Sequence, residues 1–315
     1  MLFLLLSIKI IAVGDICLGT TYPDTVLPRN PYKLFEEVKD VLKMGDIVFG
    51  NLEGVLCNDG EPAKIPEKGK SYLFRMPEKY GEVLKYAGFN VLSLANNHSM
   101  DFGRYGIEKT KEILKKCGIK YSSKDGEIAE FIINGVKICL MAVSFGAPPR
   151  SILYPDRIFK EIKSLKKYYD VIIVSVHGGG EGISFLHIKD TVEYFMGENR
   201  GNLLRFAHRA VDAGADLILC HGAHVPRPVE IYKNRLIVYG LGNFCTYGKF
   251  NLKGPSGFAP VFLIEINEKG EFLKGKIFSF IQYPPGGPRK DLKNRAFYLI
   301  KKLSLEDFGK FENFY

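Results

Sequence analysis

The sequence predicts an α/β fold with mainly parallel strands in its first two thirds and antiparallel hairpins after them. Two observations lead to this prediction: short apolar runs alternate with amphipathic helical patterns, and tight-turn signals separate pairs of apolar runs later in the chain. Alternation of strands and helices favours parallel pairing, whereas a two-residue turn between strands favours a hairpin. The 315 residues, 46% of them hydrophobic, can bury one large core, so we expect a single domain over residues 1–315.

The first part of the chain is predicted to contain three strands, each followed or preceded by a helix. Buried apolar runs predict strands at residues 8–13, 46–50 and 89–95. Apolar residues at helical spacing predict helices at residues 34–42, 77–87 and 107–117. Pro77 at the start of the second helix and Gly88 just past its end are residues expected at those positions.

The remainder of the chain is predicted to add three hairpins and further strands and helices. Turn residues at 134–135, 233–234 and 269–270 separate the strand pairs 131–133 with 136–143, 229–232 with 236–239, and 260–266 with 272–280. Between the first two hairpins we expect helices around 158–165 and 203–211 and strands at 170–176 and 215–220. From Lys290 onwards the chain is expected to be helical and then irregular.

Charge and cysteine content indicate which class of partner and which redox compartment to expect. Lys and Arg number 44 against 35 Asp and Glu, which gives a formal net charge of +9. This balance favours an anionic substrate, but the basic residues occur as scattered pairs rather than as a block, so we expect no nucleic-acid partner. Six widely spaced cysteines without a Cys-x-x-Cys pair indicate free thiols in a reducing compartment.

The N-terminal run at residues 1–7 is apolar but much shorter than the roughly 20 residues that a membrane span needs. It has neither a basic leader nor a small-residue cleavage site, and Lys9 interrupts it. We therefore expect a cytoplasmic protein without a membrane anchor. A truncated export signal is the alternative interpretation of the same residues.

Polar clusters follow five of the predicted strands at the point where each strand ends. They are Gly14-Asp15, Asn51-Leu52-Glu53, Asn96-Asn97-His98 with Asp101, His177 with Glu181, and His221 with His224. Four of the six histidines belong to these clusters. Because ligands bind beyond the carboxyl ends of parallel strands, we expect the clusters to converge at one edge. Each cluster taken alone is also compatible with ordinary turn chemistry.

Carboxylate, amide and imidazole groups together form a mixed oxygen and nitrogen ligand set. Such a set suits one or two divalent ions such as Mn, Zn, Fe or Mg, and it differs from the all-oxygen site of calcium. Two ions that share a carboxylate can activate water and hold a phosphoryl oxygen. The sequence contains no Gly-x-x-x-x-Gly-Lys-Ser/Thr loop and no serine nucleophile elbow. Phosphoester hydrolysis is therefore the reaction that this pattern supports best.

The same residues resemble the motifs of the CapA family, the capsule or poly-γ-glutamate synthesis proteins, which is related to the calcineurin-like metallophosphoesterases. The matching segments, in the family's order, are VGDICLG at 13–19, NLEG at 51–54, LANNHSMDFG at 94–103, VHG at 176–178, GAD at 214–216 with HGAHV at 221–225, and GLGNF at 240–244. They lie in a core at residues 8–250, which hairpins and a helix at 251–315 follow. The resemblance implies a four-layer α/β/β/α sandwich with its site at the strand ends.

The resemblance also implies which residues bind metal and which meet the substrate. The implied metal ligands are Asp15, Glu53, Asn97, His177, His221 and His224. Among them, Glu53 stands where the phosphoesterases have a bridging aspartate. His98 matches the histidine that acts on the substrate, and we expect Asp101 to orient it. Beside these positions, the residues expected to bind substrate are Asn51, Glu181 and Asn243.

Two positions depart from the pattern of the related sequences. Cys17 stands where phosphoesterases usually have a histidine, and Gly222 occupies the place of an additional histidine that CapA-type sequences often have. Two hypotheses follow. In the first, the protein is a metal-dependent hydrolase of a phosphoester or a related anionic, polymer-linked substrate. In the second, it keeps the fold without catalysis and binds an anionic polymer such as polyglutamate. The family resemblance also allows a membrane-associated or exported protein.

Overall fold

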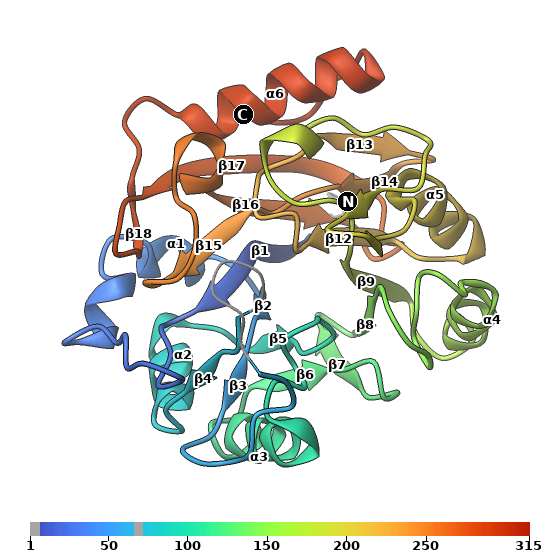
Figure 1. Ribbon diagram of the computed structural model, residues 1–315. Coiled ribbons are helices and arrows are strands. Elements are labelled where there is room, and N and C mark those ends of the chain that lie inside the picture. Colours follow the sequence, from blue (N-terminus) through green and yellow to red (C-terminus); the bar gives the residue numbers. More distant parts are fainter. Residues whose placement is uncertain (1–6, 66–71) are drawn as a thin grey trace.

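Two large β-sheets lie at the centre of the structure, with helices on their outer sides (Figure 1). The structure is a computed structural model, and it describes residues 7–65 and 72–315. The apolar N-terminal run, on which the predicted location depends, therefore lies outside the described residues except for Ser7.

The first sheet has the strand order β18-β17-β16-β1-β2-β5-β6, and β15 also pairs with β1. Its strands are β1 (Ile8–Cys17), β2 (Ile47–Leu52), β5 (Val91–Ser93), β6 (Lys120–Ser122), β15 (Asn243–Thr246), β16 (Phe258–Ile266), β17 (Phe272–Gln282) and β18 (Pro288–Lys290). The strands β15, β1, β2, β5 and β6 run parallel to one another. The C-terminal hairpin adds β16 antiparallel to β1, followed by β17 and β18.

The second sheet has the strand order β13-β14-β12-β9-β8-β7, with a parallel centre and an antiparallel hairpin at each edge. Its strands are β7 (Ile128–Ile133), β8 (Val136–Ser144), β9 (Val171–His177), β12 (Leu217–His221), β13 (Val229–Tyr232) and β14 (Arg235–Val238). Two short pairs lie outside the large sheets: β3 (Val55–Leu56) with β4 (Arg75–Met76), and β10 (Tyr194–Phe195) with β11 (Glu198–Asn199).

The two sheets pack against each other through a shared apolar core. In β1, Ile10 enters this core, while its neighbour Ile11 enters a second core on the outer side of the first sheet. In β9, Ile173 enters the shared core, and Ile172 enters a third core on the outer side of the second sheet. Successive side chains of a strand point to opposite faces, so the central strands are buried on both faces and have continuous apolar sequences.

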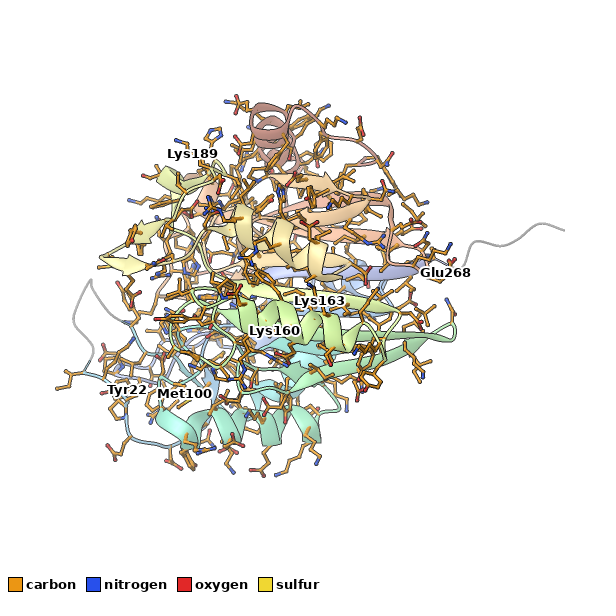
Figure 2. All side chains as sticks on the ribbon, turned by 90° about the vertical axis from the view of Figure 1, so that its right-hand side faces the viewer. Tyr22, Met100, Lys160, Lys163, Lys189 and Glu268 are labelled. Atoms are coloured by element: carbon orange, nitrogen blue, oxygen red, sulfur yellow. The ribbon has the colours of Figure 1, made fainter. Side chains whose placement is uncertain are left out.

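Helices supply the two outer layers. The outer core of the first sheet includes residues of α1 (Lys39–Leu42), α2 (Tyr80–Ala87) and α3 (Gly103–Lys116). The outer core of the second sheet includes residues of α4 (Asp156–Leu165) and α5 (Leu203–Ala213). Lys160 and Lys163 lie on the solvent side of α4 (Figure 2). The predicted four-layer α/β/β/α sandwich is therefore confirmed.

The remaining helices lie at the margins of the layers. The last helix, α6 (Arg295–Phe308), packs along β13, β16 and β17 and places Ile300 in the shared core (Figure 1). Three short 3₁₀ helices complete the structure: η1 (Pro31–Phe35), η2 (Ile183–Phe185) and η3 (Gly254–Gly257).

Most predicted elements are confirmed, with differences at their ends. The strand β1 continues to Cys17, so Asp15 lies within the strand rather than beyond it. The helix expected at residues 34–42 is instead the separate short helices η1 and α1. Asn30 caps η1 through the backbone N–H of Tyr32, and this earlier start shifts the first turn ahead of the predicted helix. The sequence analysis did not predict the short strand β15, because its four residues offer no apolar run.

Candidate metal centre

Sheet register brings the polar strand ends together. His177 on β9 and His221 on β12 occupy directly paired positions in the second sheet. In the first sheet, Asp15 on β1 pairs with Asn51 on β2 and with Asn243 on β15. These are the carboxyl ends of parallel strands, where an α/β sheet binds ligands. Met100 belongs to the polar segment that contains His98 and Asp101. It lies at the opposite end of the molecule from Glu268, which is in the turn between β16 and β17 (Figure 2).

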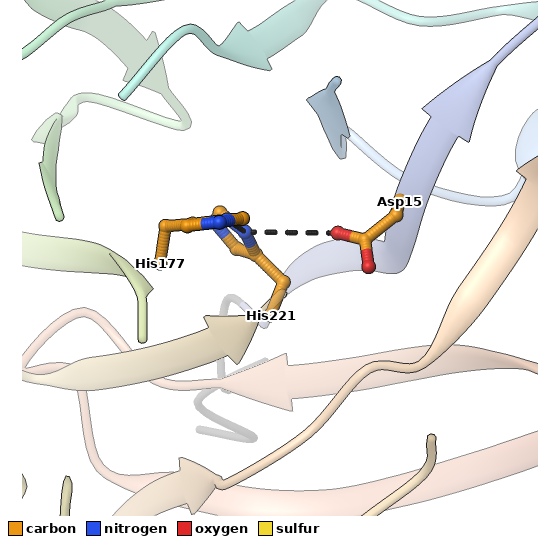
Figure 3. A group of neighbouring side chains, drawn as sticks. All are labelled: Asp15, His177 and His221. Carbon is orange, nitrogen blue, oxygen red and sulfur yellow. Dashed lines mark hydrogen bonds and ion pairs between the residues drawn. The ribbon is translucent and has the colours of Figure 1, made fainter. Parts of the chain in front are cut away.

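A first group of candidate ligands consists of Asp15, His177 and His221, whose ligand atoms all lie within 4.8 Å of one another (Figure 3). The Nδ1 atoms of His177 and His221 are 3.1 Å apart, and Nδ1 of His221 is 3.8 Å from Oδ1 of Asp15. Nε2 of His221 lies 2.8 Å from the Ser175 hydroxyl, which fixes the ring. All three ligand residues are buried.

Burial keeps both histidines of this group neutral. It lowers the pKa of His221 to about 4, although the charge of Asp15 opposes this change. Burial, with the nearby His221 imidazole and the charge of Arg200, also lowers the pKa of His177 well below its usual value. Neutral imidazole is the form that binds a metal ion. At neutral pH the group therefore offers two nitrogen lone pairs and one carboxylate.

A second group consists of Asp15, Glu53 and His224, again with ligand atoms within 4.8 Å of one another. Nδ1 of His224 is 2.9 Å from Oδ2 of Asp15, and its Nε2 is 3.7 Å from Oε1 of Glu53. Burial alone lowers the pKa of His224, but the charges of Glu53 and Asp15 raise it well above its usual value. Asp15 is the residue common to both groups. Its Oδ1 faces His221 of the first group, and its Oδ2 faces His224 of the second group.

Glu53 gives the clearest indication of a cation. Its side chain is completely buried, and among the described residues neither carboxylate oxygen has a hydrogen-bond partner. Burial, followed by the charge of Asp15, raises the pKa of Glu53 well above its usual value. A buried carboxylate without a partner is unfavourable by several kcal/mol, and a cation removes this penalty. The donor set also suits a divalent metal ion, because it combines carboxylates with imidazoles, of which those of His177 and His221 are neutral.

Buried amides hold Asp15 in place. Nδ2 of Asn51 donates to Oδ1 of Asp15 over 2.8 Å. Burial alone would raise the pKa of Asp15. The contacts with His224, His221 and Asn51 outweigh burial and lower this pKa below its usual value. Nδ2 of Asn96 in turn donates to Oδ1 of Asn51 over 3.0 Å. Both amides are buried. Asn51 was expected to bind substrate, but in this structure it contacts the candidate metal ligand Asp15 and does not line the pocket. Partners of this kind orient metal ligands.

His98 and Asp101 form a pair beside the two ligand groups. Nδ1 of His98 lies 2.8 Å from Oδ2 of Asp101, and the backbone N–H of Phe74 donates to the same oxygen over 2.7 Å. The ring of Phe74 lies 4.6 Å from the ring of His98. The imidazole is thus held at one nitrogen by Asp101 and along one side by the ring of Phe74.

A pocket of about 270 Å³ opens next to these residues, and both His98 and His224 line it. Glu181 also lines the pocket, with Oε1 accepting from the guanidinium of Arg200 over 2.8 Å and Oε2 3.9 Å from Nε2 of His224. Asn243 lines it too, and its Oδ1 lies 3.0 Å from Nδ1 of His224.

The remaining predicted ligand, Asn97, has an exposed side chain. Its neighbour Asn96 is the buried asparagine of this segment and connects to Asp15 through Asn51. Asn96 was placed in the same cluster without a separate role, because the family resemblance gave the ligand position to Asn97.

The family of the chain follows from its sequence. Residues 9–247 match the family model described as "Bacterial capsule synthesis protein PGA_cap". This chain belongs to that family. It is similar to the PGA biosynthesis protein CapA of Bacillus subtilis (28% identity over 249 residues) and to the capsule biosynthesis protein CapA of Bacillus anthracis (30% identity over 253 residues). Each alignment covers 74% of this chain and 61% or 58% of the relative, so the chain spans about three fifths of their length.

A solved structure also resembles this PGA_cap chain. A 5'-nucleotidase precursor from Thermus thermophilus aligns with 94% of this chain and 59% of its own, with 13% identity and a TM-score of 0.47. At this score the likeness carries no argument about activity. Over residues 7–65 and 72–315, no helix combines the length and the hydropathy needed to cross a membrane.

The departures at Cys17 and Gly222 from the patterns of related sequences have structural explanations. Cys17 is buried in the outer core of the first sheet, where burial raises the pKa of its thiol, and it belongs to neither group of candidate ligands. Gly222 has a φ of +90°, and a Cβ at this position would lie 2.5 Å from Cε1 of His177. Glycine at 222 is therefore required by the close approach of the His177 ring.

Proposed function

We propose that this PGA_cap protein is a metal-dependent phosphoesterase that acts on an anionic substrate of capsule or polyglutamate biosynthesis. The observation that carries the proposal is the buried Glu53 carboxylate, which has no hydrogen-bond partner among the described residues and lies beside Asp15. The names of the two Bacillus relatives support the biosynthetic context.

The chain's own residues have distinct roles in this proposal. Asp15, His177 and His221 would hold one divalent ion, and Asp15, Glu53 and His224 would hold another. When bound, the ions supply positive charge that activates a water and holds a phosphoryl oxygen. The amide of Asn51 keeps Asp15 oriented toward both groups.

His98 is proposed to deliver the proton. Its Nδ1 contacts Asp101, which stabilises the imidazolium and leaves Nε2 for the substrate. As water attacks phosphorus and the bond to the leaving group breaks, His98 gives its proton to the leaving oxygen. Asp101 acts through His98 and is therefore a positioning residue.

The non-catalytic alternative, binding of an anionic polymer such as polyglutamate, has less support from the site. Among the described residues that line the pocket, Lys249 is the only permanent cation, and the acid Glu181 faces the same space. A polyanion requires several cations along its path.

Turnover of phosphoesters tests the proposal. The purified chain is loaded with Mn²⁺, Zn²⁺ or Mg²⁺ and assayed with p-nitrophenyl phosphate and bis-p-nitrophenyl phosphate. We expect metal-stimulated hydrolysis that falls by about 10²–10⁴-fold in His98→Ala. His208→Ala is the matched control, because His208 contacts Glu230 and Tyr232 away from the site. Absence of metal-stimulated turnover with every ion, or full activity of His98→Ala, would overturn the proposal.

A further inference from the structure

One wall of the pocket is aromatic. The rings of Phe74 and Phe250 are nearly parallel, at 18°, with centroids 5.0 Å apart. Tyr72 continues the wall, with its ring at 1° to that of Phe74 and a centroid distance of 6.3 Å. All three residues line the pocket, and we name them the aromatic wall.

The aromatic wall is continuous with the candidate metal centre. Phe74 lies 4.6 Å from the ring of His98, which is the proposed proton donor. Phe250 lies 5.6 Å from the ring of His224, which belongs to the second ligand group. A group attached to the reacting phosphorus therefore meets this wall rather than open solvent.

The wall remains partly accessible. Tyr72 is 43% exposed, and Phe250 is only partly buried, whereas Phe74 is buried behind them. Aromatic faces that are not fully covered by the chain itself can stack with a flat group of a ligand. Phe195, from the separate strand β10, adds a further ring to the lining of the same pocket.

Size and charge restrict what can bind against the aromatic wall. The pocket of about 270 Å³ is slightly smaller than the roughly 300–1,000 Å³ that ligand sites occupy, so it suits one ring-sized group rather than a length of polymer. Lys249 and Glu181 contribute opposite charges to the described lining. An uncharged group is therefore favoured there over an acidic one.

We propose that the substrate is a phosphoester whose leaving group carries a flat, uncharged ring that stacks on the aromatic wall. This inference rests on the phosphoesterase function proposed above. In the reaction, a water oxygen bonds to phosphorus, the bond from phosphorus to the ring-bearing oxygen breaks, and that oxygen takes the proton of His98. The attacking water loses one proton to solvent, and solvent returns a proton to His98.

Binding of two phosphonates, which have a P–C bond that is not hydrolysed, tests this inference without turnover. Phenylphosphonate carries a ring and methylphosphonate does not, and both present the same anionic head. We expect the metal-loaded protein to bind phenylphosphonate about tenfold more tightly in calorimetry, since stacking on aromatic rings gives gains of this order. Phe250→Ala and Tyr72→Ala are expected to reduce this preference to about twofold, with the affinity for methylphosphonate unchanged.

Controls separate the possible outcomes. Tyr154→Ala removes an exposed tyrosine outside the pocket and is expected to keep the tenfold preference. Because 43% of Tyr72 is exposed and Phe250 is more deeply buried, the Tyr72 variant is expected to fold even if Phe250→Ala does not. Equal affinities for the two phosphonates in the unmodified protein, or a preference that survives both wall variants, overturn the inference but leave the phosphoesterase proposal standing. Failure of the metal-loaded protein to bind either phosphonate overturns both.

Discussion

At the scale of single residues, the arrangement of carboxylates differs from what the family resemblance implies. The resemblance gives Glu53 the bridging position, whereas the geometry makes Asp15 common to both ligand groups. The reason is that Oδ1 of Asp15 faces His221 while its Oδ2 faces His224. Glu53 approaches His224 alone among these two histidines.

Metal content distinguishes these two arrangements. If Asp15 is shared, Asp15→Asn loses both ions, whereas Glu53→Gln loses only the ion of the second group. Each lost ligand is expected to weaken binding by at least the 10–100-fold that is typical of supporting residues. Elemental analysis after dialysis measures the stoichiometry. Retention of one ion by Asp15→Asn, together with loss of both by Glu53→Gln, would show that Glu53 is the bridge.

Gly222 gives a second prediction at this scale. Gly222→Ala places a Cβ 2.5 Å from His177 at a φ of +90°, so it combines backbone strain with a clash. Gly126→Ala is a matched control, because its φ is +120° and nothing lies within 4 Å of the new Cβ. We expect a loss of unfolding free energy of about 1–2 kcal/mol for the control and about 1–3 kcal/mol more for Gly222→Ala.

Denaturant unfolding measures this difference. Displacement of the His177 ring in Gly222→Ala is also expected to weaken the ion of the first group, because His177 is one of its three candidate ligands. Equal stability of the two variants, with full metal content, would mean that the close approach of Gly222 to His177 has no role.

At the scale of elements, the strands that could be predicted from the sequence are those buried on both faces. The strands β9 and β12 have continuous apolar sequences because both of their faces are covered, and this pattern is visible without the structure. The pairs β3 with β4 and β10 with β11 have two residues per strand, so the tertiary structure rather than local sequence determines them. The same holds for β15, whose only partner among the described strands is β1.

The candidate site divides in the same way. Asp15, His177 and His221 could be predicted because each follows an apolar run of its sequence. Parallel pairing brings His177 and His221 together, and the packing of the two sheets adds Asp15. The aromatic wall could not be predicted. Tyr72 and Phe74 lie in one segment before β4, and Phe250 lies in the loop between β15 and η3. These two segments show no periodic pattern, and only the fold makes them neighbours.

At the scale of the whole molecule, the candidate metal centre joins the two sheets. Asp15 belongs to the first sheet, whereas His177 and His221 belong to the second, so an ion bound by all three connects both halves of the sandwich. These strand ends lie between the apolar core of the two sheets and the solvent. Metal binding should therefore stabilise the native state as a whole rather than one loop.

Thermal unfolding with and without metal tests this connection. Because an ion that binds only the native state stabilises it by about 2.7 kcal/mol at a concentration 100 times its Kd, we expect a rise in Tm of roughly 5–10 °C over chelator-treated protein. Asp15→Asn should abolish the rise, whereas Asp190→Asn, which alters an exposed ion pair with Arg205, should retain it. A Tm that does not respond to stoichiometrically bound metal, or a full response in Asp15→Asn, would mean that the ion does not connect the sheets through Asp15.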